Sequence, residues 1–505
     1  MSTESQIESK PLDFTAEAVN LTGETRVEET TCEGDTEKNE DECIEYNELW
    51  LDDIEDIDLY NEGGHHPVNL GDVLNDRYEV VHKLGIGGFG LVWLCRDTME
   101  NRWRAIKIMA AEQSKDCNEE RIYSHLLKQS SSKNLRKEHL ALPSEQFWID
   151  GPNGRHYCLA LPVLGPTVAD WLYVVRKNSN PEQLLNYVLS ACRQIAQGVH
   201  TLHKLGVCHG DLKPSNVMME LKGLDDLDKA QILELLGEPE TFEITTESGK
   251  PPAPRAPECV VLAPYKRWWK KSATSSVSII DFGASFLTTQ PPELGFMSTA
   301  YAAPEVLWQT QFQPGPCSDI WSLAATFFEI LTMLGMFSGE DLGSAIKSFE
   351  YFLGGIPDPY RSIYHSQWCA ATGRPAPERK PQKADQVQSI DESKWEKFPM
   401  AWDYETLVDS RRLRMKGSNY GDPLEAALGR ESSICWKGVT DEEPKTTIKY
   451  AYPRKDVVRL ADLLRKMLRY DLAKRITAEE VINHPALSRF SGSDGLTGAL
   501  EYLHI

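Results

Sequence analysis

The stretch of sequence that decides the fold is Cys208-His209-Gly210-Asp211-Leu212-Lys213-Pro214-Ser215-Asn216. It sets an aspartate, a lysine and an asparagine at fixed offsets, namely Asp211, Lys213 and Asn216. A polar loop that merely follows a helix would not require these residue types at this spacing. A second motif, Ile279-Ile280-Asp281-Phe282-Gly283, places an acid at the end of an apolar strand. Together the two motifs predict a site for phosphoryl transfer.

Each residue of these motifs has an expected role in that chemistry. Asp211 would accept or orient the proton of the substrate hydroxyl, and Lys213 would neutralise charge on the transferred group. Asn216 and Asp281 offer the oxygen atoms that hold Mg²⁺ between phosphates. The cofactors expected from the sequence are therefore ATP and Mg²⁺.

A glycine-rich turn lies upstream, in Gly85-Ile86-Gly87-Gly88-Phe89-Gly90. Because Gly85, Gly87 and Gly90 lack a Cβ atom, their backbone amides can approach phosphates closely. Dinucleotide-binding folds use the same pattern, but a helix follows it there. Here alternating residues continue as a strand through Val92. The pattern over 77–108 predicts strand, glycine turn, strand, turn and strand.

The remaining nucleotide-binding residues are expected close to this turn. Lys107, 17 residues after Gly90, would contact the α- and β-phosphates and needs a carboxylate partner from the next helix. We prefer Glu119 to Glu120 because it keeps the spacing of the helix's apolar face. The hinge between the lobes is expected at 162–164. The residues expected around adenine are Val92, Ala105 and Leu161, and Leu164 of the hinge is expected to donate its backbone N–H to the nucleotide.

Helical periodicity over 182–203, 319–333 and 457–468 completes an α+β outline, with a small β-rich lobe followed by a larger helical one. Features of the helical part favour a protein kinase over a small-molecule kinase. Ala303-Pro304-Glu305 follows Asp281 at a short distance, and Asp319 opens an apolar helix where it can cap the catalytic loop. Arg475 is expected to pair with Glu305 and tie this segment to the helical lobe.

Composition limits where the protein acts. Of the net charge of −22 over 505 residues, residues 1–60 carry 20 acidic and 3 basic side chains, a net of −17. We expect this tail to be disordered, either as a solubilising segment or as an acidic competitor for basic substrates. The 11 cysteines include no CxxC pair, which predicts reduced thiols and a place in the cytoplasm and nucleus. No membrane or direct nucleic-acid partner is expected, and we expect a monomer.

With these motifs in place, the chain resembles the SR-protein kinases. The resemblance begins at Glu55-Asp56-Ile57-Asp58-Leu59-Tyr60 and continues through Gly63-Gly64-His65-His66-Pro67-Val68. It includes a spacer between Asn216 and Asp281, which lie 65 residues apart, and a docking-type insert near the end. The compact spacer and Phe282 look closest to fungal members. The boundaries expected are a tail at 1–60, a small lobe at 61–164 and a large lobe at 165–495, interrupted at 220–276 and 337–453.

The resemblance implies a serine/threonine protein kinase that uses ATP and Mg²⁺ to phosphorylate Arg/Ser-rich proteins such as splicing factors. The sequence departs from the family where substrate is read. Ser298-Thr299-Ala300-Tyr301-Ala302 lacks the expected arginines, and the docking insert carries a basic run at 411–414. A related kinase with other substrates and an ATP-binding scaffold are therefore the alternatives. Gly210 stands where many kinases have an arginine that binds an activation-loop phosphate, so we expect activity without that phosphorylation.

Overall fold

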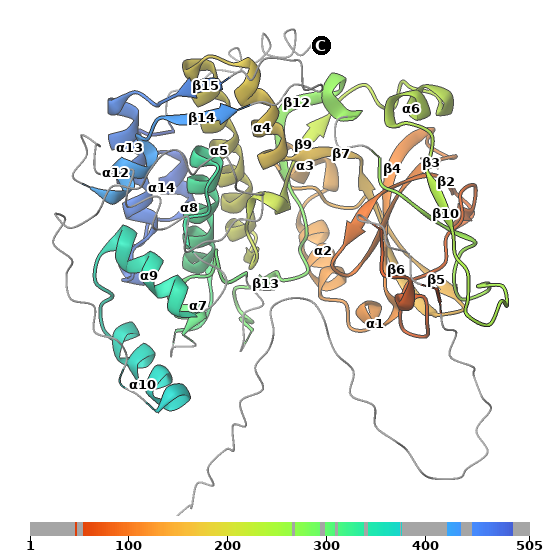
Figure 1. Ribbon diagram of the computed structural model, residues 1–505, viewed down its shortest axis with the longest axis horizontal. Coiled ribbons are helices and arrows are strands. Elements are labelled where there is room, and N and C mark those ends of the chain that lie inside the picture. Colours follow the sequence, from red (N-terminus) through yellow and green to blue (C-terminus); the bar gives the residue numbers. More distant parts are fainter. Residues whose placement is uncertain are drawn as a thin grey trace, which may run out of the picture.

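The structure is a computed structural model that describes residues 46–47, 54–264, 268–292, 298–308, 312–337, 342–373, 375, 422–435 and 447–487. The tail up to residue 45 and the basic run at 411–414 lie outside the described residues. A β-rich lobe, to the right in Figure 1, joins a mostly helical lobe to its left, as the sequence predicts. Among the described residues, no helix combines the length and apolarity needed to cross a membrane.

The small lobe is built on a six-stranded antiparallel sheet in the order β1-β2-β3-β4-β6-β5. The predicted strand and turn pattern is confirmed, with Gly87 opposite Gly90 where β2 turns into β3. Three short helices separate β4 from β5. The bounds are β1 (Val73–Leu74), β2 (Tyr78–Gly87), β3 (Gly90–Asp97), β4 (Arg102–Met109), α1 (Ala111–Ser114), α2 (Asn118–Gln129), α3 (Ser132–Lys137), β5 (Glu145–Gly151) and β6 (Gly154–Pro162).

The expected tail boundary at residue 60 is wrong, because residues 54–60 fold onto the small lobe and form the short helix η1 (Ile57–Leu59). Tyr60 is 1% exposed, and its hydroxyl donates to Glu55 at 2.8 Å. The Glu55 carboxylate forms a buried ion pair with Lys83 of β2. From composition alone we expected Glu55 to be a solvated charge of the tail. In the structure it is buried and its charge is balanced by Lys83.

The same leading segment attaches to the connection between β4 and α2. The amides of Ala111 and Glu112 donate to the carbonyls of Gly64 and Gly63 at 2.9 and 2.8 Å. His66 packs against His156 with ring centroids 4.9 Å apart. Burial, together with the nearby His156, lowers the pKa of His66 to about 4, so this imidazole is neutral near pH 7. Residues 63–66 therefore help to place α2.

The spacer leaves the large lobe after β9 (Val217–Leu221) and returns as β12 (Ala273–Ile279), yet its middle packs on the small lobe. Figure 1 shows α6 (Lys229–Leu236) and β10 (Thr241–Glu243) beside the small sheet; β10 pairs with β11 (Cys259–Val261). Trp103 of β4 donates its amide to Asp225 at 2.9 Å and its indole N–H to the Leu227 carbonyl at 3.0 Å. The sequence predicted an interruption of the large lobe at 220–276 without saying where it packs, and in the structure the apolar side chains of its middle part cover the small sheet.

The large lobe is organised around α8, most of whose residues are buried. The predicted helices are confirmed as α5, α8 and α13, and α5 begins with a capping box between Asn180 and Gln183. The bounds are β7 (Leu164–Thr167), α4 (Val168–Asn178), α5 (Pro181–Lys204), β8 (Val207–Cys208), η2 (Pro214–Asn216), η3 (Trp268–Lys271), β13 (Phe286–Leu287), α7 (Pro304–Leu307), α8 (Pro316–Thr332), α13 (Arg454–Met467), η6 (Leu472–Lys474) and α14 (Ala478–Ile482).

The expected start of the insert at residue 337 is wrong, because Phe337 still belongs to the core of the large lobe. Phe337 is 3% exposed, and its ring lies 4.5 Å from that of Phe349 in the lobe's core. The first helix of the insert is therefore part of the packed lobe, because its apolar face meets α8 through Trp321 and Phe349. The described elements are α9 (Leu342–Leu353), α10 (Tyr360–Thr372), α12 (Pro423–Leu428), β14 (Ser432–Cys435) and β15 (Thr447–Tyr450).

Candidate active site

Lys107 and Glu119 meet as the sequence predicts. The Lys107 Nζ atom lies 3.0 Å from both carboxylate oxygens of Glu119, which decides between Glu119 and Glu120. The Glu119 side chain is 1% exposed and that of Lys107 is 11% exposed. Burial by itself would lower the pKa of Lys107, but the carboxylates of Glu119 and Asp281 outweigh it and raise that pKa above its usual value. Lys107 is thus held as a cation beside Asp281.

The strand register shows that the residues predicted to bind adenine and phosphate lie on one side of the small sheet. Val92 lies opposite Lys107, and Ala105 lies opposite Leu161. Because residues that face each other across strands, or lie two apart along one, point to the same side, these four side chains share one face of the sheet. Leu164, the last residue of the predicted hinge, begins β7. The predicted adenine pocket is therefore consistent with the strand pairing.

Three of the four glycines in the turn, Gly85, Gly87 and Gly90, differ in how close a Cβ atom would come to neighbouring atoms. A Cβ atom on Gly85 would meet nothing within 4 Å, so the backbone there borders open space. A Cβ on Gly90 would lie 2.1 Å from the Ile108 carbonyl oxygen, so this glycine permits the close approach of β3 to β4. Gly87 stands between these cases, with the nearest atom, the Gly90 carbonyl oxygen, at 3.3 Å.

The catalytic loop brings Asp211, Lys213 and Asn216 together. The Lys213 ammonium lies 2.6 Å from Oδ2 of Asp211, and the Asn216 amide donates to the same oxygen at 3.1 Å. The other oxygen, Oδ1, accepts from the backbone amide of Ser298 at 3.3 Å. The Asp211 carboxylate is thereby oriented from three directions, and its side chain remains 15% exposed.

As expected, Asp319 of α8 accepts hydrogen bonds from the backbone of this loop. Its carboxylate accepts from the backbone amides of His209 and Gly210 at 2.8 and 3.0 Å and bonds His203 at 2.9 Å. Burial opposes the charge, but these hydrogen bonds and the histidines keep the pKa of Asp319 below its usual value. A buried carboxylate therefore fixes the loop backbone in one conformation.

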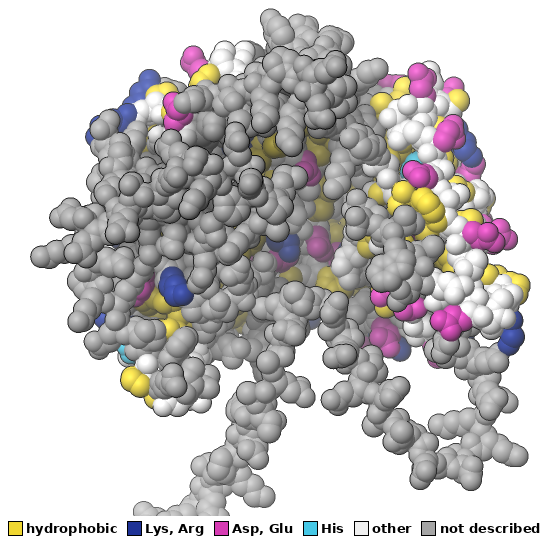
Figure 2. Space-filling model, viewed as in Figure 1, with side chains coloured by type: hydrophobic (Ala, Val, Ile, Leu, Met, Phe, Trp, Pro, Cys, Tyr) yellow, Lys and Arg dark blue, Asp and Glu magenta, His cyan; other side chains and the backbone are white. Residues whose placement is uncertain are grey.

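Asp281 is set beside the loop by the pairing of β9 with β12. Val217 pairs with Ile279, and the Ile280 amide donates to the Asn216 carbonyl at 3.0 Å. Asp281 adopts a left-handed backbone with a φ of 62°. Figure 2 shows a hollow between the lobes in which acidic and basic side chains gather. Both expected metal ligands, Asn216 and Asp281, belong to this junction.

The segment after Asp281 is docked onto α2. Phe282 is fully buried, with its ring 5.4 Å from that of Tyr123. Asn118 donates to the carbonyls of Gly283 and Ser285 at 2.9 and 2.6 Å. Sequence reasoning missed Asn118, since a polar residue at the start of a helix is ordinary there. Its contacts join the helix that carries Glu119 to the segment that carries Asp281.

The predicted pair of Glu305 and Arg475 is present and fully buried. Arg475 donates to both oxygens of Glu305, at 2.7 and 3.1 Å, and to the Cys317 carbonyl at 2.8 Å. Ser318 adds a hydrogen bond to Glu305 at 2.9 Å. The pair thus anchors the segment after the active site to the lower part of the large lobe.

Comparison with known proteins agrees with this geometry. The family model described as the protein kinase domain matches residues 78–267. The chain carries a protein kinase domain. The relatives of this kinase domain include SRSF protein kinase 3 of Homo sapiens, 35% identical over 168 residues, which are 33% of this chain and 29% of that protein. Serine/threonine-protein kinase spk-1 of Caenorhabditis elegans is 35% identical over 179 residues, which are 34% of this chain and 18% of that protein.

A longer match to the kinase domain and its surroundings is serine/threonine-protein kinase SRPK of Physarum polycephalum. It is 25% identical over 467 residues, which cover 87% of this chain and 93% of that protein. A crystal structure of another kinase domain covers 84% of this chain and 98% of its own, with a TM-score of 0.51 and 18% identity. The chain spans about a third or less of the length of the first relatives it matches. The expected closeness to fungal members stays a prediction.

Proposed function

We propose that this protein is a serine/threonine kinase that transfers phosphate from ATP to protein hydroxyl groups. The observation that carries this proposal is the single constellation formed by Lys107, Glu119, Asp211 and Asp281. Lys107 is paired in the small lobe, Asp211 is oriented in the large lobe, and Asp281 lies between them. A scaffold that only binds nucleotide has no need to keep all of these contacts.

The residues present fit ATP and a divalent cation, for which we propose Mg²⁺. The open space beside Gly85 and Gly88, where a Cβ would meet nothing within 4 Å, leaves room for phosphate groups next to backbone amides. Asn216 and Asp281 supply hard oxygen ligands at the junction of the lobes. When bound, MgATP supplies the phosphoryl group and neutralises part of its charge.

The chain's own residues then divide the work. Lys107 holds the phosphates in place because its charge is retained by Glu119 and Asp281. Asp211 receives or orients the proton of the substrate hydroxyl, and its position is kept by Asn216 and by the Ser298 amide. Lys213, 2.6 Å from Asp211, is placed to stabilise charge on the transferred group.

Serines in Arg/Ser-rich proteins, such as splicing or mRNA-processing factors, are the substrates we propose. The names of the relatives support this substrate class. The chain also offers an acidic group in this region, because Tyr301 of the activation segment, which lies within electrostatic reach of Asp211, donates to the partly exposed Glu329 at 2.5 Å. A guanidinium of the substrate can pair with such a carboxylate. We further propose that the protein works in the cytoplasm and the nucleus as a monomer.

The kinase is not expected to require phosphorylation of its activation segment. Gly210 has a φ of 81°, and a Cβ there would lie 2.2 Å from the Ala284 carbonyl oxygen. A side chain that could reach a phosphate has no room at this position. We therefore expect full activity of protein that carries no phosphate.

The proposal is tested by phosphate transfer from labelled ATP and Mg²⁺ to an Arg-Ser repeat peptide and to the same peptide with lysine in place of arginine. We expect strong preference for the arginine peptide, lost in Asp211→Asn. Equal labelling of both peptides would retain the kinase and reject the Arg/Ser substrates. ATP binding with labelling of neither peptide would reject the kinase and favour the scaffold.

A further inference from the structure

The helix α2, which carries Glu119, is joined to the large lobe at its C-terminal end. Nε2 of His125 forms a hydrogen bond with the Leu205 carbonyl at 2.9 Å. The side-chain amide of Gln129 donates to the same carbonyl at 3.2 Å. Because Leu205 directly follows α5, these two contacts restrain the C-terminal end of α2 against the large lobe.

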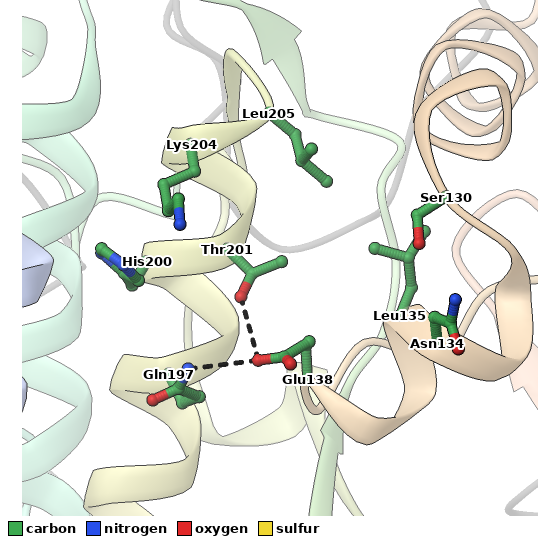
Figure 3. Close-up of a pocket in the computed structure, with 9 residues that line it drawn as sticks. All are labelled: Ser130, Asn134, Leu135, Glu138, Gln197, His200, Thr201, Lys204 and Leu205. Atoms are coloured by element: carbon green, nitrogen blue, oxygen red, sulfur yellow. Dashed lines mark hydrogen bonds between the residues drawn. The ribbon is translucent and has the colours of Figure 1, made fainter.

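The segment that follows α3 strengthens this connection to α5. The Glu138 carboxylate accepts from the side chains of Gln197 and Thr201 at 3.1 and 3.4 Å, as Figure 3 shows. A Cβ atom on Gly198 would lie 3.3 Å from the carbonyl oxygens of Glu138 and His139, so α5 and this segment approach closely. The region after α2 is therefore a fixed point from which the helix extends toward the active site.

The N-terminal end of α2 meets the segment after Asp281 through Asn118. Its side-chain amide donates to the carbonyls of Gly283 and Ser285 at 2.9 and 2.6 Å. That segment is itself attached to the catalytic loop, because the Ser285 hydroxyl donates to the His209 carbonyl at 2.8 Å and β13 pairs with β8. Asn118 thus joins α2 to a part of the chain that is held by the large lobe.

The position of Glu119 depends on how the N-terminal end of α2 is held. Glu119 follows Asn118 and lies about 15 Å along the helix from Gln129 at the rise of an α-helix. With the far end fixed, a tilt of about 10° moves Glu119 by about 3 Å. Such a movement would break the contact of 3.0 Å between Glu119 and Lys107. Protein kinases need this ion pair in place, and many use a phosphate on the activation segment to keep it there.

We propose that Asn118 is a positioning residue that takes the place of an activation-segment phosphate. This inference rests on the proposed kinase function, because it concerns how the ion pair of Lys107 and Glu119 is kept together. Gly210 has no side chain with which to bind a phosphate, so the tie between the segment and α2 has to come from elsewhere. The Asn118 amide supplies it without modification. Its acceptors are backbone carbonyls, so the contact forms once the segment after Asp281 has folded.

Loss of the Asn118 contact should act on turnover more than on ATP binding. Two hydrogen bonds shift an equilibrium by about 5- to 100-fold. We expect Asn118→Ala to lower kcat for the Arg-Ser repeat peptide by about 5- to 30-fold, because α2 tilts away in more of the molecules. The KM for ATP should change by less than about threefold, since the strands predicted to face adenine stay in place. Asn118→Asp, which has the same size but no donor, should lose at least as much, and Asn118→Gln, which keeps the amide, should recover part of the activity.

Amide hydrogen exchange of the full chain, followed by mass spectrometry, gives a readout that does not depend on activity. In Asn118→Ala, exchange in 119–124 and 282–287 should be faster by about fivefold or more. Exchange in 132–138 should stay as in the parent, because the contacts with α5 are kept. Arg121→Ala, at an exposed residue of the same helix, is the control and should leave both turnover and exchange unchanged.

The outcomes separate this proposal from the proposed function. Phosphatase-treated parent protein should keep its activity, and loss of activity after that treatment would overturn the proposal, since a phosphate would then hold the helix. Unchanged kcat and exchange in Asn118→Ala and Asn118→Asp would overturn it as well. A fall in kcat that only matches the loss of folded protein in urea unfolding would reduce Asn118 to a structural role. A parent without phosphate transfer but with the expected exchange pattern would reject the kinase function and still support the contact between α2 and the segment.

Discussion

The Gly210→Ala variant tests whether close contact between the catalytic loop and the segment after Asp281 requires glycine at position 210. In the structure a Cβ at this position would lie 2.2 Å from the carbonyl oxygen of Ala284 and 3.0 Å from its carbonyl carbon. Ser285 also donates to the His209 carbonyl at 2.8 Å, so the two segments cannot separate freely. The backbone φ of 81° adds strain for any residue other than glycine.

The size of the effect follows from these two contributions. A left-handed backbone costs a non-glycine residue about 1–2 kcal/mol, and forcing an extra methyl group into a packed site costs about 1–3 kcal/mol. We expect Gly210→Ala to lower the free energy of unfolding by about 2–5 kcal/mol. Because Ala284 follows Gly283, its displacement shifts Asp281, and a shift of 1 Å lowers turnover by about 10²-fold.

Gly223→Ala is the matched control. Gly223 has a φ of 74°, but a Cβ there would meet nothing within 4 Å, so it reports the backbone cost alone. Urea unfolding should show a loss of about 1–2 kcal/mol for this variant, and phosphate transfer should be unchanged. Equal stability and equal turnover of the two variants would refute the argument that contact with Ala284 excludes a side chain at Gly210.

Four further changes test other parts of the structure. Asp211→Asn should lower turnover by about 10²–10⁴-fold in the labelled-ATP assay while nucleotide binding is kept, because the proton acceptor is lost. Arg475→Met should lower the free energy of unfolding by about 3–5 kcal/mol, since it leaves Glu305 charged and buried, and adding Glu305→Met should recover part of that loss. The pKa of His66 is lowered to about 4 in the folded state, so the unfolded state binds more protons below about pH 6.5, and stability should fall by up to about 3 kcal/mol as the pH drops toward 4. His66→Gln should flatten this part of the urea-unfolding pH profile. Glu329→Gln should reduce the preference for arginine over lysine peptides by about tenfold in kcat/KM, because a charge-assisted hydrogen bond is removed.

Each of these expectations can fail in a specific way. Normal turnover of Asp211→Asn would remove it from proton transfer, and an Arg475→Met variant as stable as the parent would show that the buried pair is not an anchor. Identical pH profiles with and without His66 would assign the acid sensitivity to other groups. Unchanged peptide preference in Glu329→Gln would place arginine recognition elsewhere.

Much of the active site could be predicted because its signals are local. Asp211, Lys213 and Asn216 lie within six residues, and Asp281 sits in a motif of its own. Lys107 was identified from its strand, and the apolar spacing of α2 selected Glu119 over its neighbour. The strand order from β2 to β4 followed from alternation and a glycine turn, both of which act over a few residues.

The sequence did not show the placement of segments whose position depends on distant partners. Residues 54–60 looked like solvated tail until Lys83 provided a buried partner for Glu55. The middle of the spacer follows β9 in sequence, yet Trp103 of the small lobe binds it through Asp225 and Leu227. No periodicity within these segments identifies the surface against which they pack.

The sequence by itself therefore predicted the residues of the candidate site, because the spacing of its acids, lysines and glycines reflects what phosphate and metal ions require. Only the tertiary structure decided how these groups are held. Asn118, which sequence reasoning missed, joins α2 to the carbonyls of Gly283 and Ser285 across 165 and 167 residues. Such contacts arise when the two lobes pack together, and a local pattern carries no record of a partner that distant in the chain.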